Sequence, residues 1–219
     1  MCIFLVGTKG HKVIQNIPPL EIVEKIMAAP KTLTDKLLVY GLIYTGMRVG
    51  EFVHMRREWI RWDLNKIYIP REQPCSICQS CRKERYKKKR EAGKWTGEWV
   101  LVKPANTWRA KTDNAVRSIN ISPELKAVLS EFFAEHKAVQ EVFPYRELAW
   151  TRLKQLSKEA GVKWRLFPHL VRGIVASKLA SQKVDVYRLK EIMGWKDIDV
   201  AAEYVKLYRP STKEEVVKW

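Results

Sequence analysis

Apolar residues recur at three- and four-residue intervals along most of the chain, which is the pattern of helices with one buried face. The clearest case follows Ser122, a typical N-cap, and Pro123, which fits the first helical position. Its apolar face consists of Leu125, Val128, Leu129, Phe132 and Phe133. The same pattern predicts further helices over 20–28, 33–44, 49–56, 146–160, 168–181, 186–193 and 199–208. We therefore expect a mainly helical fold.

Three short segments, 66–69, 98–102 and 116–121, are strand-like. Together they predict a small three-stranded antiparallel sheet at one side of an α+β fold. Between the first two lies the segment 71–99, which is polar, basic and rich in cysteine. It is long for a hairpin loop, so we interpret it as an insertion.

The hydrophobic content, 46% of 219 residues, is ample for one large domain. The domain proper is expected to begin near Ile17, which leaves 1–16 as an N-terminal extension. Residues 17–219 then form one domain, with 209–219 as a C-terminal tail. The longest nearly apolar stretch, 37–44, is far too short to cross a bilayer, so no membrane partner is expected.

The chain is strongly basic: 41 Lys and Arg against 24 Asp and Glu give a formal charge of +17. Such an excess favours a polyanionic partner, and nucleic acid is the leading candidate. A solvated basic surface without such a partner is the alternative. Three of the four cysteines fall in one short run, which is unlike a secreted disulfide framework. We therefore expect an intracellular, cytoplasmic protein.

Several short patterns follow one another along the chain. They are Thr45-Gly46-Met47-Arg48-Val49-Gly50-Glu51, Lys111 in Ala110-Lys111-Thr112-Asp113, Pro168-His169-Leu170-Val171-Arg172, Met193-Gly194-Trp195, and Tyr204. In this order and at these distances they resemble the catalytic domain of the tyrosine recombinase, or phage-type integrase, family. The resemblance spans roughly 17–208 and makes 17–219 the catalytic domain. It implies site-specific DNA recombination or integration through a 3′-phosphotyrosine, without a cofactor for catalysis.

The chemistry of the residues supports this interpretation. Two guanidiniums, Arg48 and Arg172, suit the clamping of phosphate oxygens, because each is planar and permanently charged. His169 lies three residues before Arg172, so both side chains can project from one helical face. With an ordinary pKa near ~6.5, an imidazole can accept the phenol proton and return it. Glu51 is expected to orient Arg48, although the two could simply form a local ion pair.

The resemblance assigns the remaining roles. Tyr204 is the nucleophile, and Tyr208, four residues on, is its competitor. Lys111 is the general acid that protonates the leaving 5′ oxygen, with Lys103 as a nearby alternative. Trp195 stands where the family has His or Trp, and its indole N–H can donate a hydrogen bond but cannot exchange a proton.

Two departures from the family pattern are visible. Gly173 follows Arg172 where the family often has a second histidine, which should tune activity rather than abolish it. Relatives usually carry an N-terminal DNA-binding domain, and 1–16 is too short to form one, so it was either removed or never present.

The expected partner is duplex DNA. The family acts as four protomers on two DNA sites, so we expect a homotetramer there and a monomer or weak oligomer without DNA. Three other functions stay open. They are a type IB-like topoisomerase, a non-catalytic DNA-binding regulator that keeps the fold, and a zinc-dependent nucleic-acid adaptor.

Cys75, Cys78 and Cys81 have the tight spacing of metal ligands. A closed tetrahedral zinc site needs a fourth ligand, which could be Cys2, His54 or another residue that the sequence does not identify. Structural zinc is the first interpretation and an iron–sulfur cluster the second. The alternative is three free thiols in a mobile loop.

A basic run follows these cysteines: Arg82, Lys83, Arg85, Lys87, Lys88, Lys89 and Arg90. Tyr86 within it could stack. Such runs are often merely solvated, yet beside a DNA-cleaving site they would contact phosphates without reading the sequence. We favour the DNA-binding interpretation.

Overall fold

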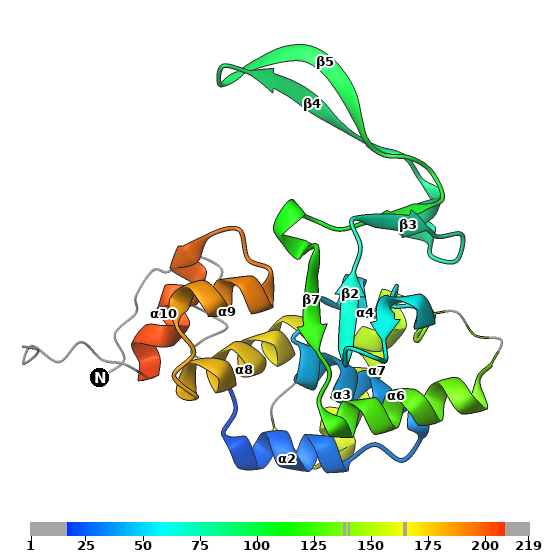
Figure 1. The fold of residues 1–219 in the computed structure, drawn as a ribbon, viewed down its shortest axis with the longest axis vertical. Coiled ribbons are helices and arrows are strands. Elements are labelled where there is room, and N and C mark those ends of the chain that lie inside the picture. Colours follow the sequence, from blue (N-terminus) through cyan, green and yellow to red (C-terminus); the bar gives the residue numbers. More distant parts are fainter. Residues whose placement is uncertain (1–16, 138, 140, 164–165, 209–219) are drawn as a thin grey trace, which may run out of the picture.

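Helix α3 (Leu33–Thr45) packs against most of the other long helices in the computed structural model, which describes residues 17–137, 139, 141–163 and 166–208 (Figure 1). Its neighbours are α2 (Leu20–Ala28), α6 (Pro123–Glu135), α7 (Arg146–Glu159) and α8 (Pro168–Ser181). The backbone N–H of Asp35 donates to the Thr32 hydroxyl at the N-terminus of α3. Leu37, Leu38 and Leu42 are fully buried. Each buried leucine contributes about 1.5–3 kcal/mol, so α3 contributes strongly to the core.

The helices predicted from apolar spacing are confirmed, with bounds shifted by a residue at some ends and one larger correction. The helix expected over 49–56 is only the short α4 (Val49–Phe52). Beyond it the backbone turns, and Arg56 pairs with Glu141 in an isolated antiparallel bridge. Arg56 thus pairs with a segment 85 positions away in sequence, a contact that apolar spacing could not reveal.

The three-stranded antiparallel sheet is present, but one of its strands was predicted wrongly. Its order is β1 (Ile60–Arg61), β2 (Lys66–Ile69) and β7 (Arg117–Asn120), with Ile67 opposite Ile119. The segment 98–102 is not part of it, because it lies in β5 (Lys94–Lys103), which pairs with β4 (Arg85–Glu91). β1 has two residues, too few for an alternation to be visible in sequence.

The end of the described chain forms a second small core. Helices α8, α9 (Val186–Met193) and α10 (Ile198–Tyr208) pack on one another, and α9 also contacts β7. Gly194 ends α9 with φ of 59°. A Cβ on this residue would lie 2.7 Å from the carbonyl oxygen of Asn114. Glycine is therefore needed for both the left-handed turn and the close approach of the two backbones.

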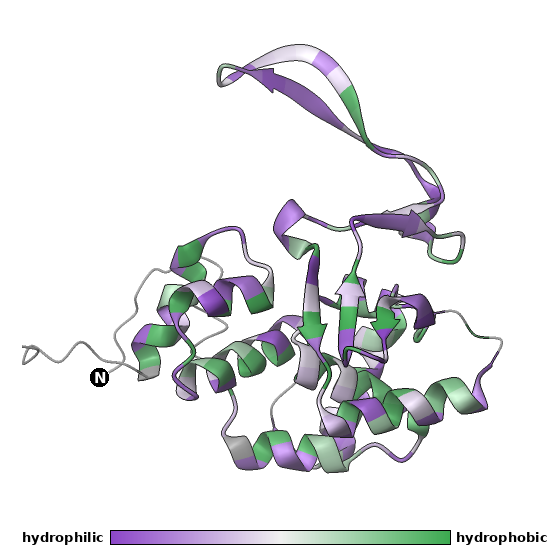
Figure 2. Cartoon of the chain, viewed as in Figure 1, coloured by the Kyte–Doolittle hydropathy of each residue, from purple (hydrophilic) through white to green (hydrophobic). Residues whose placement is uncertain are grey.

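The segment between β2 and β7 is folded and extends from the body. It begins with β3 (Glu72–Pro74), which pairs with β6 (Thr107–Arg109). The short helix α5 (Gln79–Arg82) follows β3 along the chain. Strands β4 and β5 then project away from the helices as a long hairpin (Figure 1). We call residues 85–103 the hairpin arm. Figure 2 shows that β4 is hydrophilic almost throughout, as expected for a strand with few buried neighbours.

The predicted N-terminal extension, 1–16, and the C-terminal tail, 209–219, lie outside the described residues. Within the described ranges, no helix has both the length and the apolar character that a membrane span requires.

Candidate active site

Arg48 stands where the chain leaves α3 and enters α4. Gly46 adopts a left-handed turn after α3, and Arg48 is the N-cap residue of α4. Its guanidinium donates to Glu51 Oε1 and to the carbonyl oxygen of Gly194, both at 2.8 Å. The backbone N–H of Arg48 also donates to Glu51 Oε2, at 2.9 Å. These bonds fix the side chain, while its 22% exposure leaves part of the guanidinium open to a ligand.

Glu51 is a buried carboxylate shared between two arginines. It is 3% exposed, and Arg117 Nη2 binds its second oxygen at 3.1 Å. Burial raises the pKa of Glu51, but the charges of Arg117, Arg48 and Arg172 together hold it below its ordinary value. Glu51 is therefore ionised and forms an ion pair with Arg48.

Arg117 is a site residue that the sequence patterns did not reveal. It lies in β7, its side chain is 7% exposed, and it also donates to the carbonyl oxygens of Ile192 and Ala115 at 2.9 Å. Sequence alone offers no signal for it, because a basic residue in an alternating strand normally faces solvent. Its bonds instead join the sheet to α9.

Arg172, on α8, is 6% exposed and lies beside the same turns. Its guanidinium donates to the carbonyl oxygens of Gly46 and Met193. Burial, reinforced by the charge of Arg48, lowers the pKa of Arg172 to about 9. It therefore remains cationic at neutral pH. Three guanidiniums surround one carboxylate, so the site carries an excess of positive charge suited to an anion.

Trp195 and Tyr204 stack on each other beside Arg172. Their ring centroids are 5.5 Å apart with an interplanar angle of 15°, and the Arg172 guanidinium lies 5.7 Å from the Trp195 ring centroid. Tyr204, on α10, is 5% exposed. Burial raises its pKa to about 12, although the charge of Arg172 opposes the shift. The phenol is thus protonated at neutral pH and needs a base to become a nucleophile.

His169 and Lys111 are exposed residues at the edge of this group. The pKa of His169 is lowered, first by partial burial and then by the charges of Arg172, Lys111 and Arg48. Because the charge of Lys111 contributes to this shift, the imidazole of His169 lies within electrostatic reach of Lys111, which is in the loop before β7. The imidazole is therefore neutral at neutral pH and can accept a proton.

Lys103 and Tyr208 are the alternatives to Lys111 and Tyr204 that the sequence offered. The Lys103 ammonium is buried and donates to the carbonyl oxygens of Cys81, Lys83 and Pro104, so it is engaged at the base of the hairpin arm. Tyr208 ends α10, and its side chain lies outside the described residues.

A second cluster lies at the base of the hairpin arm. His54, Cys75, Cys78 and Cys81 place their ligand atoms within 4.8 Å of one another. Cys75 and Cys81 are buried, and Cys78 is partly buried. His54, one of the named candidates for a fourth ligand, is in the cluster, while Cys2 lies outside the described residues.

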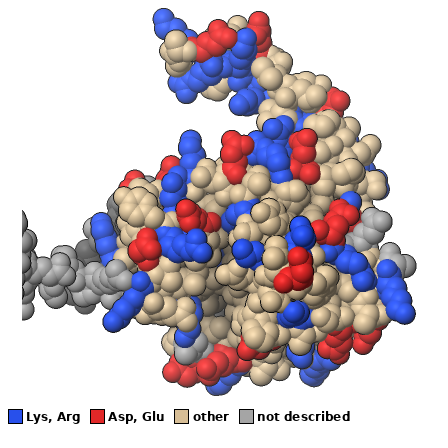
Figure 3. Space-filling model, viewed as in Figure 1, with Lys and Arg blue, Asp and Glu red and all other residues tan. Residues whose placement is uncertain are grey.

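The basic run predicted to bind DNA lies on α5 and along the hairpin arm. All of its members except the partly exposed Lys89 are exposed. Figure 3 shows Lys and Arg gathered on the arm. Two aromatic rings share this surface: Lys88 Nζ lies 5.6 Å from the Trp99 ring centroid, and the Arg90 guanidinium 5.3 Å from that of Trp95. Both tryptophans are more than 60% exposed.

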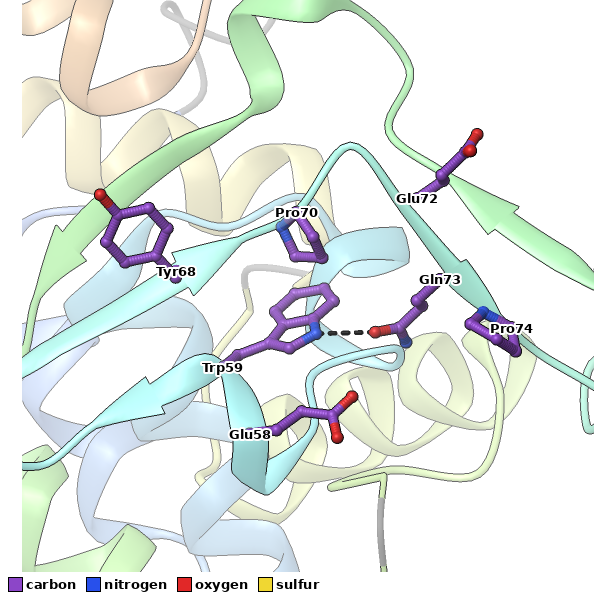
Figure 4. Close-up of a pocket in the computed structure, with 7 residues that line it drawn as sticks. All are labelled: Glu58, Trp59, Tyr68, Pro70, Glu72, Gln73 and Pro74. Atoms are coloured by element: carbon purple, nitrogen blue, oxygen red, sulfur yellow. Dashed lines mark hydrogen bonds between the residues drawn. The ribbon is translucent and has the colours of Figure 1, made fainter.

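A shallow hollow, shown in Figure 4, shares no residue with the arginine and tyrosine site. It is lined by Glu58, Trp59, Tyr68, Pro70, Glu72, Gln73 and Pro74. Trp59 Nε1 donates to Gln73 Oε1 at 2.7 Å, and Gln73 Nε2 donates to the His54 carbonyl at 2.7 Å. These hydrogen bonds join the hollow to the backbone of His54, a member of the cysteine cluster. We assign the hollow no separate function.

The phage integrase family matches residues 19–210, so the chain belongs to that family. The tyrosine recombinase XerA of Saccharolobus solfataricus is 21% identical over 197 residues, which are 90% of this chain and 54% of that protein. The chain therefore spans about half the length of this curated relative.

Solved structures with the same fold include a XerA recombinase, with a TM-score of 0.63 and 13% identity over 92% of this chain and 64% of that one. Another is the Tn1549 transposon integrase in complex with transposon right end DNA, with a TM-score of 0.58 and 14% identity over 91% and 61% of the two chains. At these identities the comparison establishes the fold, which is that of the tyrosine recombinase catalytic domain.

Proposed function

We propose that this chain is the catalytic domain of a site-specific DNA recombinase, which cleaves and rejoins strands through a 3′-phosphotyrosine on Tyr204. The observation that carries the proposal is the convergence of Arg48, Arg172, Trp195 and Tyr204 on the turns at Gly46 and Gly194. Family membership and the fold support it.

In the proposed reaction the arginines bind the scissile phosphate. Arg48 and Arg172 each use part of the guanidinium on protein oxygens, which holds the remaining N–H donors in place before DNA arrives. Preorganised cations of this kind stabilise the charge that develops on the non-bridging oxygens, by about 2.7–4 kcal/mol for one donor. The reaction requires no cofactor, since side chains supply the positive charge.

The phenol oxygen of Tyr204 attacks phosphorus, and the bond from phosphorus to the 5′ oxygen breaks. His169 accepts the phenol proton, and Lys111 gives a proton to the leaving 5′ oxygen. Trp195 donates its indole N–H to the phosphate and holds the Tyr204 ring by stacking. Attack by a 5′ hydroxyl of another strand then reverses these steps and releases Tyr204.

The proposed partner is duplex DNA, with four protomers on two sites and a monomer or weak oligomer in its absence. The Tn1549 integrase is solved with transposon right end DNA, and a XerH recombinase with palindromic difH substrate, with a TM-score of 0.58 and 13% identity over 94% of this chain and 53% of that one. The basic hairpin arm would add phosphate contacts that strengthen binding without selecting a sequence. Such a protein would act inside the cell.

The deciding experiment uses a duplex with a 5′-bridging phosphorothiolate at the cleavage site, taken from the attachment region of the element that carries this protein. Cleavage releases a thiol that cannot rejoin, so a covalent adduct accumulates and survives denaturation. We expect the adduct with the wild type and with Tyr208→Phe, and none with Tyr204→Phe. Loss only with Tyr208→Phe would overturn the assignment of the nucleophile.

The alternatives give different results in the same assay. A non-catalytic DNA-binding regulator would bind the DNA in a salt-sensitive manner and form no adduct. A type IB-like topoisomerase would form the adduct and relax supercoiled plasmids that lack any attachment site. The proposed recombinase exchanges strands only between two such sites.

A further inference from the structure

We infer that His54, Cys75, Cys78 and Cys81 form a tetrahedral structural zinc site that ties the hairpin arm to the body of the domain. This site takes no part in the proposed strand cleavage, and the inference does not depend on that function. It rests on the distances, tautomer, burial and surroundings of these four side chains.

The distances between the ligand atoms fit a zinc ion. Zn–S bonds of about 2.3 Å and Zn–N bonds of about 2.0–2.1 Å in a tetrahedron separate two sulfurs by about 3.8 Å and a sulfur from a nitrogen by about 3.6 Å. Cys75 Sγ and Cys78 Sγ are 3.8 Å apart, and His54 Nε2 lies 3.3 and 3.4 Å from the sulfurs of Cys78 and Cys81. A disulfide would require about 2.05 Å, so the sulfurs are arranged around a common centre and not bonded in pairs.

The imidazole of His54 is set in the tautomer that a metal needs. Its Nδ1 is 2.7 Å from the carbonyl oxygen of Gly50, which can only accept, so Nδ1 carries the proton. The lone pair of Nε2 then faces the sulfurs. The ring also stacks on Trp108, with centroids 5.4 Å apart. A second hydrogen bond of this kind accompanies nearly every metal-binding histidine.

The charge around the cluster fits the bound state. Zinc entry releases the three thiol protons, and one Zn²⁺ with three thiolates and a neutral imidazole carries one net negative charge. The buried ammonium of Lys103 lies beside it and donates to the Cys81 carbonyl oxygen at 3.0 Å. This single positive charge offsets the negative charge of the site.

The position of the four ligands suggests what the metal does. Cys75 follows β3, and its N–H donates to the Asn106 carbonyl oxygen before β6, so these residues form the base of the hairpin arm. His54 lies two residues after α4, the helix that begins after Arg48. One ion would therefore cross-link the arm to the segment that presents Arg48.

The first test is the metal content of the full chain after reduction and reconstitution with zinc. We expect about one tightly held zinc per chain in the wild type and in Cys2→Ser, which removes the other candidate ligand. Cobalt(II) in its place should give the intense visible bands of a tetrahedral thiolate site. Absence of stoichiometric metal, or iron with acid-labile sulfide instead, would overturn the inference.

Variants of the histidine separate ligation from packing. His54→Ala should weaken zinc binding at least tenfold in competition with a chelator, whereas His54→Cys, which offers a thiolate, should retain it. His136→Ala is the matched control, because His136 Nδ1 also bonds the carbonyl four residues before it and its ring also stacks, on Phe132. Equal zinc loss in His136→Ala, or full retention in His54→Ala, would contradict the assignment.

The proposed mechanical role has its own readout in limited trypsin digestion. Chelation should accelerate cleavage within residues 82–103 of the wild type, and Cys78→Ser should show the fast rate with or without chelator. Unchanged cleavage after proven zinc removal would overturn the role in holding the arm.

Discussion

The guanidinium of Arg48 donates a hydrogen bond to the carbonyl oxygen of Gly194, 146 positions further along the chain, at 2.8 Å. This contact joins the start of α4 to the end of α9. Arg172 donates to the carbonyl oxygens of Gly46 and Met193, so it also joins the end of α3 to the end of α9. The candidate active site is therefore the place where two left-handed glycine turns, at Gly46 and Gly194, present carbonyl oxygens to two arginines.

Replacing either arginine by lysine should strongly impair strand cleavage. An ammonium cannot keep the bonds to protein carbonyls and also contact two phosphate oxygens. We expect Arg48→Lys and Arg172→Lys to lower the rate of adduct formation by about 10²–10³ fold. Arg152→Lys is the control, since Arg152 binds Asp35 through both oxygens at 2.6 and 2.7 Å, away from this site. An equal loss in the control would indicate a general folding defect.

The cleavage rate should depend on pH through His169. Partial burial and the nearby cations lower its pKa, so the neutral base is present at pH 7 and is lost only as pH falls through that lowered pKa. We expect a flat profile above the ordinary imidazole value near ~6.5 and a decline below it. His169→Gln should be slower throughout and lack that decline. A decline of the same shape in His169→Gln would assign the titration to another group.

Removing the charge of Glu51 should destabilise the fold. Glu51→Gln leaves the buried Arg117 without its carboxylate, and breaking a buried pair in this way costs about 3–5 kcal/mol. The measurement is the free energy of unfolding in urea. Glu159→Gln is the control: its carboxylate is 38% exposed in an ion pair with Arg152, so we expect a loss within about 1 kcal/mol. Comparable losses in both variants would argue against the buried network.

The pH dependence of that stability follows from the same residue. The folded pKa of Glu51 lies below its ordinary value, so its contribution is present above the unfolded pKa and is lost as pH falls through the folded one. Glu51→Gln should therefore differ most from the wild type at neutral pH and least in strong acid.

Charge on the hairpin arm should govern salt-sensitive DNA affinity. Neutralising Lys87, Lys88 and Arg90 to Gln should weaken binding to any sequence and reduce the slope of log K against log salt by about 0.9 for each phosphate that the arm no longer neutralises. Lys25, Lys31 and Lys158, all exposed on the body, provide a control with the same change in net charge. Identical slopes in the two triple variants would mean that the arm is merely solvated.

Gly194→Ala should destabilise the fold more than Gly161→Ala. Both residues have positive φ, 59° and 66°, but an added Cβ meets the Asn114 carbonyl oxygen at Gly194 and open space at Gly161. Gly161→Ala should cost about 1–2 kcal/mol of backbone strain. A further loss in Gly194→Ala, measured by thermal unfolding, would report the close approach of the two backbones. Equal losses would show that the backbone at Asn114 moves aside without a measurable loss of stability.

The sequence by itself determined most helices, because their positions depend on local periodicity and capping. Neighbouring residues alone indicate the apolar face after Ser122 and the turns at Gly46, Gly161 and Gly194. The ordered set of motifs from Arg48 to Tyr204 is likewise visible in the sequence. Helix spacing also placed His169 on the helix that carries Arg172.

Only the tertiary structure decided which distant residues meet. It paired Glu51 with Arg117, brought His54 to the cysteines, supplied β1 to the sheet and sent 98–102 into the hairpin arm. None of these contacts leaves a local signal, because each joins segments that pack together only when the whole core forms. The order of motifs along the chain predicted the candidate site residues, whereas packing fixed what each of them touches.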